Sequence, residues 1–286
     1  MKQNHWVKKV SLALLAAMMM WLNVAPVLAE ETTKLTIVSV GSDAQVWRYI
    51  AELDEVKAAH IELTVKEIDG GVELNNAVAD GVADANAFQS LGYMNSFNRE
   101  ASQKLVPIGT TYIEPMGLYS KKYTKLSDLP QQATVVLPES PVNAARALLL
   151  LQSAGLVKLK ADFDDATGTP DDVTENPKQL QFKLVEDTMT ARSLEDVDAA
   201  IIGNTIALEG GLNVLKDALY KEEINEATKS RINVIAVKKG RESDPVLLKL
   251  VDFYHLKQVQ DYVKQEFQGT KVEVKQPVKE VWSEAQ

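Results

Sequence analysis

The sequence predicts an α/β fold with two lobes and a ligand cleft between them. Short apolar runs rich in β-branched residues alternate with helical runs along most of the chain, and such alternation is typical of helices packed on largely parallel sheets. Two extended segments, at residues 112–122 and 231–239, divide the alternating units into two groups. Two lobes joined by two extended hinge segments leave a cleft, which is a favoured place for a small ligand.

The first group of units opens with a predicted strand at residues 34–40 (KLTIVSV). A turn at Gly41 follows, and apolar residues at helical spacing predict a helix over residues 44–59. The later units of this group are a strand at 61–68, a helix at 72–80, a strand at 83–88, a helix at 93–104 and a strand at 105–109.

The second group opens with a β-branched run at residues 134–137, read as a buried strand. Ser140 stands where a helix N-cap belongs, Pro141 occupies the first helical position, and the helix runs to Gln152. The remaining predicted elements are strands at 181–185, 199–202 and 231–239, a short helix at 192–197 and closing helices within 245–268.

From this order we expect lobe 1 to comprise residues 30–113 and 235–286, and lobe 2 to comprise residues 114–234. Residues 1–29 are predicted to be a signal peptide, with a basic start, an apolar run at 10–22 and cleavage after Ala29. The apolar run is short for a bilayer span, so an uncleaved anchor is the less favoured alternative.

The charge of the chain is acidic, with a formal net charge of −9. Removing residues 1–29 takes away three lysines and no acidic residue, which leaves 28 basic and 40 acidic side chains, a net charge of −12. This balance argues against nucleic acid and anionic membranes as partners. The chain contains no cysteine, which excludes a disulfide, a thiol nucleophile, a thiolate metal site and a lipid-modified cysteine. We therefore expect an exported periplasmic protein without a direct membrane anchor.

Catalysis has little support in the sequence, so we expect a protein that is not an enzyme. Beyond residues 1–29 the histidines are His60 and His255, on separate predicted elements, and no motif of a metalloprotease, serine hydrolase, phosphate loop or dinucleotide site occurs. Acidic residues at 162–165 lie in a polar segment and favour a solvated loop over a calcium site. Neither a metal nor a cofactor is expected.

The helix at residues 141–152 offers the most specific candidate site. Free N–H groups at a helix start attract anions where a strand ends in an α/β sheet. Asn143 and Arg146 are three residues apart and share one helix face. A guanidinium and an amide suit a carboxylate. The alternative is an arginine on a solvated face of the helix.

Amide side chains stand near the ends of other predicted strands, namely Asn86, Asn204 and Asn233. Each alone is more simply structural. With Arg146 they could hold the carboxylate and ammonium of an amino acid. Four apolar or aromatic residues could line a side-chain pocket: Phe88, Tyr93, Trp47 and Met116.

Several segments, in this order and spacing, carry a family resemblance: DANAFQ (84–89) with Tyr93, KLVPIGTTYIEPMGLYSKK (104–122), LPESPVNAARALLLLQSAGLVKLK (137–160), ENPK (175–178) and RSL (192–194). Together they resemble the NlpA-type methionine-binding lipoproteins, the substrate-binding components of methionine ABC importers. The resemblance covers nearly all of the chain after residue 29. It implies two α/β lobes of the periplasmic-binding-protein kind that close on one amino acid.

By matching motif, the resemblance implies that Arg146 pairs with the ligand carboxylate and that Asn143 assists. Asn204 and Asn233 match asparagines that bind the backbone groups of the ligand, and Asn86 is carried over with them. Two aromatic residues match those around the methionine side chain, Phe88 and Tyr93.

Three departures from the family pattern stand out. The lipobox cysteine is missing, so the protein is expected to be unlipidated. Ser90 stands where the family commonly has a histidine, and Gly71 where a tyrosine is common. The loss of two ring side chains from one pocket should enlarge the pocket or weaken its binding of a thioether side chain.

The sequence thus predicts a periplasmic solute-binding protein that captures an L-amino acid, methionine or a close relative, and delivers it to an ABC importer permease by hinge closure. Two alternatives stay open. One is a secreted enzyme on the same two-lobed fold, and the other is a surface or adhesion protein without a transport role.

Overall fold

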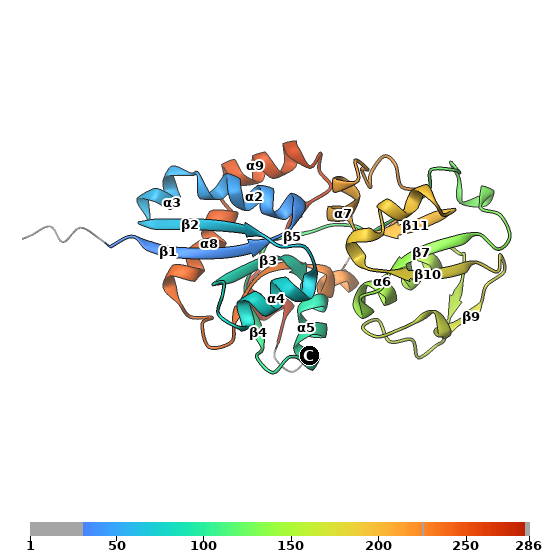
Figure 1. The fold of residues 1–286 in the computed structure, drawn as a ribbon, viewed down its shortest axis with the longest axis horizontal. Coiled ribbons are helices and arrows are strands. Elements are labelled where there is room, and N and C mark those ends of the chain that lie inside the picture. Colours follow the sequence, from blue (N-terminus) through green and yellow to red (C-terminus); the bar gives the residue numbers. More distant parts are fainter. Residues whose placement is uncertain (1–30, 225, 284–286) are drawn as a thin grey trace, which may run out of the picture. The chain divides into compact units, whose positions relative to one another are not determined.

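The structure is a computed structural model that describes residues 31–224 and 226–283. The predicted signal peptide at residues 1–29 lies outside the described residues. Two five-stranded sheets dominate the described part of the chain. We call the first sheet with its helices lobe 1 and the second sheet with its helices lobe 2 (left and right in Figure 1).

Lobe 1 contains a mixed sheet. Its strands in spatial order are β2 (Ile61–Glu67), β1 (Thr33–Ser39), β3 (Ala85–Ser90), β13 (Asn233–Lys238) and β4 (Leu105–Thr110). Its helices are α2 (Gly41–Ala51), α3 (Asp54–Ala58), α4 (Gly71–Ala79), α5 (Leu91–Glu100), α8 (Pro245–Tyr254), α9 (Lys257–Glu266) and α10 (Val278–Val281).

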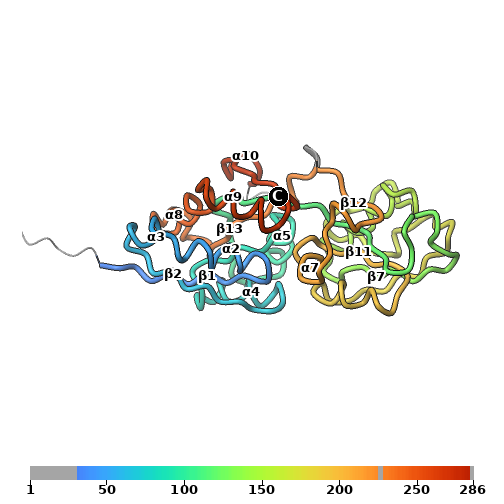
Figure 2. The backbone as a smooth tube through the Cα atoms, turned by 90° about the horizontal axis from the view of Figure 1, so that it is seen from above, coloured from blue at the N-terminus to red at the C-terminus, as the bar shows by residue number. Residues whose placement is uncertain are grey.

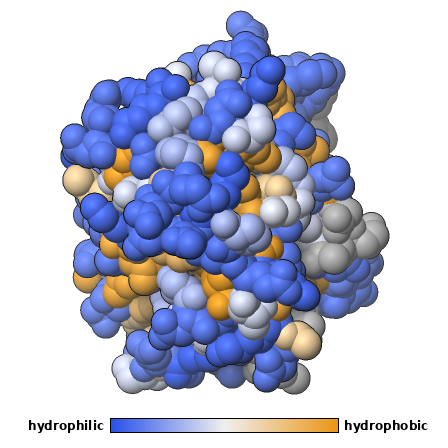
Figure 3. All heavy atoms as spheres, turned by 90° about the vertical axis from the view of Figure 1, so that its right-hand side faces the viewer, coloured by the Kyte–Doolittle hydropathy of each residue, from blue (hydrophilic) through white to orange (hydrophobic). Residues whose placement is uncertain are grey.

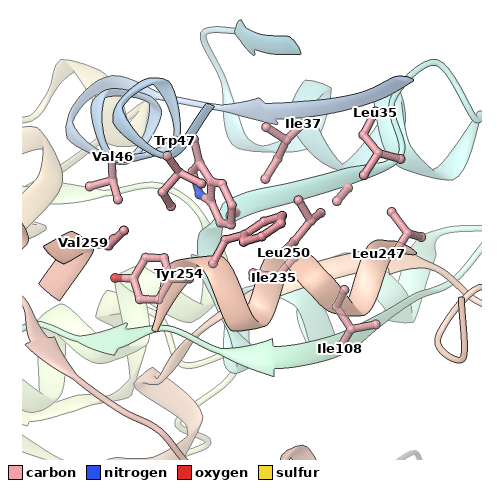
Figure 4. Packing of buried hydrophobic residues seen from close by; sticks show 14 of the residues in the cluster. Leu35, Ile37, Val46, Trp47, Ile108, Ile235, Leu247, Leu250, Tyr254 and Val259 are labelled. Carbon is pink, nitrogen blue, oxygen red and sulfur yellow. The ribbon is translucent and has the colours of Figure 1, made fainter. Parts of the chain in front are cut away.

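The two faces of this sheet carry separate apolar cores, because side chains alternate along each strand. On one face, Leu35 and Ile37 of β1 pack with residues of α2, α8 and α9 (Figure 4). On the other face, Val38 packs with residues of α4 and α5. Trp47, which the sequence offered as a pocket residue, is 1% exposed in the first core and lies 5.9 Å from the ring of Tyr254.

Lobe 2 repeats the same layering around a smaller sheet. Its strands in spatial order are β10 (Gln181–Val185), β7 (Thr134–Pro138), β11 (Ala199–Ile202), β6 (Gly117–Tyr119) and β12 (Tyr220–Lys221). The helices are α6 (Pro141–Ser153) and α7 (Asn204–Glu209), with short 3₁₀ helices η1 (Leu126–Asp128), η2 (Pro170–Asp172), η3 (Asp187–Met189), η4 (Arg192–Glu195) and η5 (Glu226–Arg231). Leu137 and Ile201 face α6, whereas Val136 and Ile202 face α7.

Two further strand pairs complete the described elements. The pair β5 (Tyr112–Ile113) and β14 (Val272–Glu273) runs antiparallel, as does the pair β8 (Lys158–Leu159) and β9 (Val173–Glu175).

The chain passes between the two sheets twice (Figure 2). The first passage lies in the predicted extended segment 112–122, whereas the second comes before the predicted segment 231–239, which is mostly β13 of lobe 1. The first leaves β5 at Ile113 and enters β6 at Gly117, and the second leaves β12 at Lys221 and enters β13 at Asn233. The strand that follows each crossing is antiparallel to its neighbours, β6 to β11 and β13 to β3. In each sheet only the strand that arrives from the other lobe is reversed: β1, β3 and β4 run in one direction in lobe 1, as do β10, β7, β11 and β12 in lobe 2. The expected largely parallel direction of the strands is therefore confirmed, with β13 and β6 as the exceptions.

The helix predicted over residues 44–59 is two helices, α2 and α3, with an extended residue, Leu53, before α3. Leu53 packs against the same core as Val56, so the break lets both side chains cover the sheet. Uninterrupted helical periodicity in the sequence did not reveal this turn.

The surface at the lobe 2 end of the molecule is mainly polar, with apolar residues scattered between polar ones (Figure 3). Among the described residues, no helix has the length and apolar character needed to cross a membrane.

Candidate functional site

A cavity of about 820 Å³ is lined by residues of both lobes. Lobe 1 contributes the start of α4, the end of β3 and part of α5, and lobe 2 contributes the starts of α6 and α7. Glu114, Met116 and Asn233, in or next to the crossing segments, also line the cavity. Elements from distant parts of the sequence therefore meet around one cavity.

The cavity includes most of the residues that the sequence singled out. The lining ones are Asn143, Arg146, Phe88, Tyr93, Met116 and Asn233. Asn86 and Asn204 are buried and are not among the lining residues.

The start of α6 holds a carboxylate of the protein itself, that of Asp187. The Ser140 backbone N–H donates to Asp187 Oδ1 at 3.1 Å, and the Ser140 hydroxyl donates to Oδ2 at 2.5 Å. Asn143 Nδ2 donates to the same Oδ2 at 2.8 Å. Ser140 precedes α6 as expected, but its side chain does not cap the helix. A ligand carboxylate would have to displace Asp187 to use this corner.

Arg146 binds a second carboxylate of the protein, that of Glu222. Its Nη2 lies 2.5 Å from Glu222 Oε2, its Nε donates to Oε1 at 2.9 Å, and Nη2 also donates to the Glu114 carbonyl oxygen at 2.9 Å. The Arg146 side chain is 14% exposed and that of Glu222 is 7% exposed. The alternative of an arginine on a solvated helix face is therefore wrong.

Glu222 binds a second guanidinium group besides that of Arg146, because Arg231 Nη1 lies 2.8 Å from Glu222 Oε1. Burial alone would raise the pKa of Glu222, but the adjacent Arg146 and Arg231 lower it below its ordinary value of 4.5. This group holds two cations and one anion, and of the three residues only Arg146 lines the cavity. The Arg146 guanidinium is therefore the group of the site best suited to a ligand carboxylate.

Phe88 and Tyr93 form an edge-to-face pair with ring centroids 5.9 Å apart. The Tyr93 hydroxyl lies over Gly71, where an added Cβ would overlap with it. The position of a side chain at residue 71 is therefore occupied by the Tyr93 side chain. Ser90 caps α5 by accepting a hydrogen bond from Tyr93 N at 3.2 Å. The serine that stands where the family commonly has a histidine therefore stabilises the start of the helix that carries Tyr93.

Asn204 begins α7 and is 1% exposed. Its Nδ2 donates to Glu114 Oε2 at 2.8 Å and to Thr270 Oγ1 at 3.1 Å. Its buried Oδ1 has no hydrogen-bond partner among the described residues. An unpaired buried acceptor is rare in folded proteins and calls for a donor. Its neighbours Gly203 and Thr205 line the cavity.

Asn86 belongs to a buried amide cluster within lobe 1. Its Nδ2 donates to Asn75 Oδ1 at 2.9 Å, and its Oδ1 accepts from Gln89 Nε2 at 2.8 Å. The Asn86 side chain thus holds Gln89, which lines the cavity. This placement favours support of the cavity wall over direct ligand contact.

A buried charged network joins the lobes near Glu114. The Lys271 side chain is 0% exposed, and its Nζ lies 2.8 Å from Asp43 Oδ1 and 3.3 Å from Glu114 Oε2. The same Nζ donates to Thr205 Oγ1 of α7 at 3.0 Å. Asp43 lies on α2 of lobe 1, so the network connects both lobes at the crossing.

Sequence reasoning missed the charged partners in these contacts, Asp187, Glu222 and Lys271. Glu222 stands in the run Lys221-Glu222-Glu223, which reads as a solvated surface. Lys271 pairs with a residue 228 positions away. Local patterns contain no signal for such pairs. Within residues 31–224 and 226–283, no group of three or more His, Cys, Asp or Glu side chains could hold a metal ion.

Comparison with known proteins places these features in context. The family described as NlpA lipoprotein matches residues 35–275. A relative from Pasteurella multocida, a probable D-methionine-binding lipoprotein, is 36% identical over 237 residues, which cover 82% of this chain and 84% of that protein.

Two solved structures are also similar. A nutrient-binding protein from Burkholderia cenocepacia bound to methionine has a TM-score of 0.78 and 36% identity, and the match covers 84% of this chain and 99% of the other. The substrate-binding protein of a methionine transporter from Streptococcus pneumoniae has a TM-score of 0.78 and 37% identity, with 85% and 96% covered.

Proposed function

Because the chain belongs to the NlpA lipoprotein family, we propose that it is the solute-binding protein of an ABC importer. It captures an L-amino acid, methionine or a close relative, and delivers it to the membrane permease. The observation that carries the proposal is the cavity of about 820 Å³ lined from both lobes, with Arg146 and the Phe88–Tyr93 pair among its lining residues.

The amino-acid ligand is bound through its charged ends and its side chain. Its carboxylate approaches the guanidinium of Arg146, which lines the cavity. Its ammonium donates to acceptors near Asn204, whose buried Oδ1 has no partner among the described residues. Asn143, Asn233 and Asn86 stay in the proposed site, the last through its bond to Gln89.

Binding works by a shift between open and closed lobes and involves no catalysis. A ligand that touches both lobes stabilises the closed arrangement, which the permease then recognises. The protein acts after export to the periplasm. It is unlipidated, because the chain has no cysteine to carry a lipid, so its docking to the permease is protein–protein.

A thermal-shift screen tests this function. The protein without residues 1–29 is unfolded and refolded to remove any bound ligand, then heated with each of the twenty amino acids, methionine analogues and methionine-containing dipeptides. We expect methionine or a close relative to raise the melting temperature, because a ligand that binds only the folded state stabilises it. A melting temperature unchanged by every compound would reject the proposal.

A further inference from the structure

The cavity contains many more carboxylates than cations. Apart from Glu114, which has Lys271 as its partner, six carboxylates line it: Glu73, Asp80, Glu100, Glu139, Glu186 and Asp187. No described lysine or arginine lies within ion-pair distance of any of these six. Arg146 is the only basic residue that lines the cavity in the described part of the chain, and Glu222 already binds it.

Three of these carboxylates, Glu73, Glu186 and Asp187, line the cavity together with Tyr93, and Glu73 and Glu186 are exposed at its edge. Burial raises the pKa of Tyr93, and the negative charges of Asp187, Glu73 and Glu186 raise it further. Asp187 is held in place by Ser140 and Asn143, and the Glu186 carboxylate accepts from the backbone N–H of Thr188 at 3.0 Å. The Asp187 carboxylate is therefore held in place before any ligand arrives, whereas Glu186 caps η3 at an exposed position.

The same region offers aromatic faces. Phe88 and Tyr93 stand edge to face at 74°, and both line the cavity. A cation near an aromatic face is attracted by the ring, and most strongly when water is excluded. Carboxylates and aromatic rings favour the same kind of group, a positive charge.

We propose, on the basis of the amino-acid-binding function above, that the ligand's side chain ends in a single positive charge that lies between the Phe88–Tyr93 pair and the carboxylates of Glu73, Glu186 and Asp187. The ligand carboxylate lies at Arg146, which is six residues after Ser140 and therefore about 9 Å farther along α6. A neutral thioether would gain nothing from the three carboxylates.

This arrangement also links the positive charge of the ligand side chain to the closure of the two lobes. Glu73 belongs to α4 of lobe 1, whereas Asp187 begins η3 of lobe 2 and Glu186 precedes it. Without a cation between them, these carboxylates repel one another across the cavity as the lobes approach. A cation turns that repulsion into attraction to both lobes, so the charged ligand favours the closed state more than a neutral one does.

The charge could be a sulfonium, as in methionine methylated on sulfur, or an ammonium, as in lysine. Calorimetric titration of refolded protein compares two matched pairs, S-methylmethionine with methionine and lysine with norleucine. We expect the charged member of at least one pair to bind about tenfold more tightly than its neutral partner. The pair that shows the difference identifies the source of the charge.

A double variant, Glu73→Gln with Glu186→Gln, removes two of the three charges and keeps the shapes of the side chains. We expect it to abolish most of the tenfold preference while methionine affinity stays within about twofold. Glu223→Gln, an exposed residue outside this cavity, is the control and should keep the preference. Circular dichroism melts of all three proteins verify that they are folded.

The outcomes separate this inference from the function on which it rests. Methionine that binds as tightly as its sulfonium derivative, with norleucine equal to lysine, overturns the inference and leaves the transport function standing. An unchanged preference in the double variant also overturns the inference. Failure of all four compounds and of the thermal-shift screen rejects both.

Discussion

Glu222 links the guanidinium groups of Arg146 and Arg231, and its removal should expose their mutual repulsion. We expect Glu222→Gln to lower the free energy of unfolding by roughly 3–5 kcal/mol, because it leaves Arg146 and Arg231 buried without a counter-charge. Urea denaturation measures the change. Glu223→Gln makes the same substitution at an exposed neighbour and should change stability little.

The lowered pKa of Glu222 predicts a pH dependence. A carboxylate with a depressed folded-state pKa contributes stability above its unfolded pKa and loses that contribution as pH falls through its folded pKa. The wild-type protein should therefore lose stability as the pH falls below 4.5, the ordinary pKa of a glutamate. Glu222→Gln should lose less stability over the same pH range. Urea midpoints from pH 7 to pH 3 compare the two proteins, and equal losses would show that Glu222 does not carry this dependence.

The variant Asn86→Ala tests whether Asn86 supports the cavity wall or contacts the ligand directly. Asn86→Ala removes partners from Asn75 and Gln89, both buried, and should lower stability by about 1–3 kcal/mol. Asn76→Ala, at an exposed residue on α4, is the matched control for stability. Ligand affinity in Asn86→Ala should fall less than in Arg146→Ala. An affinity loss as large as that of Arg146→Ala would place Asn86 in direct contact with the ligand.

At the scale of elements, α5 and α6 approach each other closely at Gly92. A Cβ added there would lie 3.2 Å from Val142 Cγ2 and 3.2 Å from the Ser230 carbonyl oxygen. Because α5 belongs to lobe 1 and α6 to lobe 2, Gly92→Ala should hinder their approach and weaken ligand binding several-fold, with a smaller effect on melting temperature without ligand. Titration calorimetry measures the affinity.

Equal affinities of Gly92→Ala and wild type would mean that binding does not depend on close approach of α5 and α6.

Most elements were predictable from local patterns. The strand at 134–137 and the helix after Ser140 correspond to β7 and α6, because β-branched runs and helix-start signals are properties of adjacent residues. The antiparallel β6 and β13 were not predictable in this way. Their direction depends on where the chain returns from the other lobe, which no local window records.

The site residues also divide into those that local patterns predict and those that long-range contacts determine. Local chemistry singled out Arg146, but its partner Glu222 is 76 residues away. Gly71 looked like lost ring volume, whereas the Tyr93 ring occupies that space. Side-chain partners set by tertiary contacts stay hidden until the fold brings them together.

At the scale of the whole molecule, Lys271 connects the lobes through Asp43, Glu114 and Thr205. Lys271→Met should lower the free energy of unfolding by roughly 3–5 kcal/mol, because two buried carboxylates lose their cation. Lys257→Met removes an exposed lysine, 87% accessible, that pairs with Asp261, and water already screens that pair. Urea denaturation of both variants gives the comparison, and a Lys271→Met protein as stable as Lys257→Met would show that the network does not hold the lobes.

The account as a whole depends on the cavity being the place where an amino acid binds. A crystal structure of refolded protein grown with the best ligand of the thermal-shift screen tests this most directly. We predict density for one ligand in the cavity, its carboxylate beside Arg146 and its side chain beside Phe88 and Tyr93. Ligand density elsewhere on the protein, with only water in the cavity, would contradict the account.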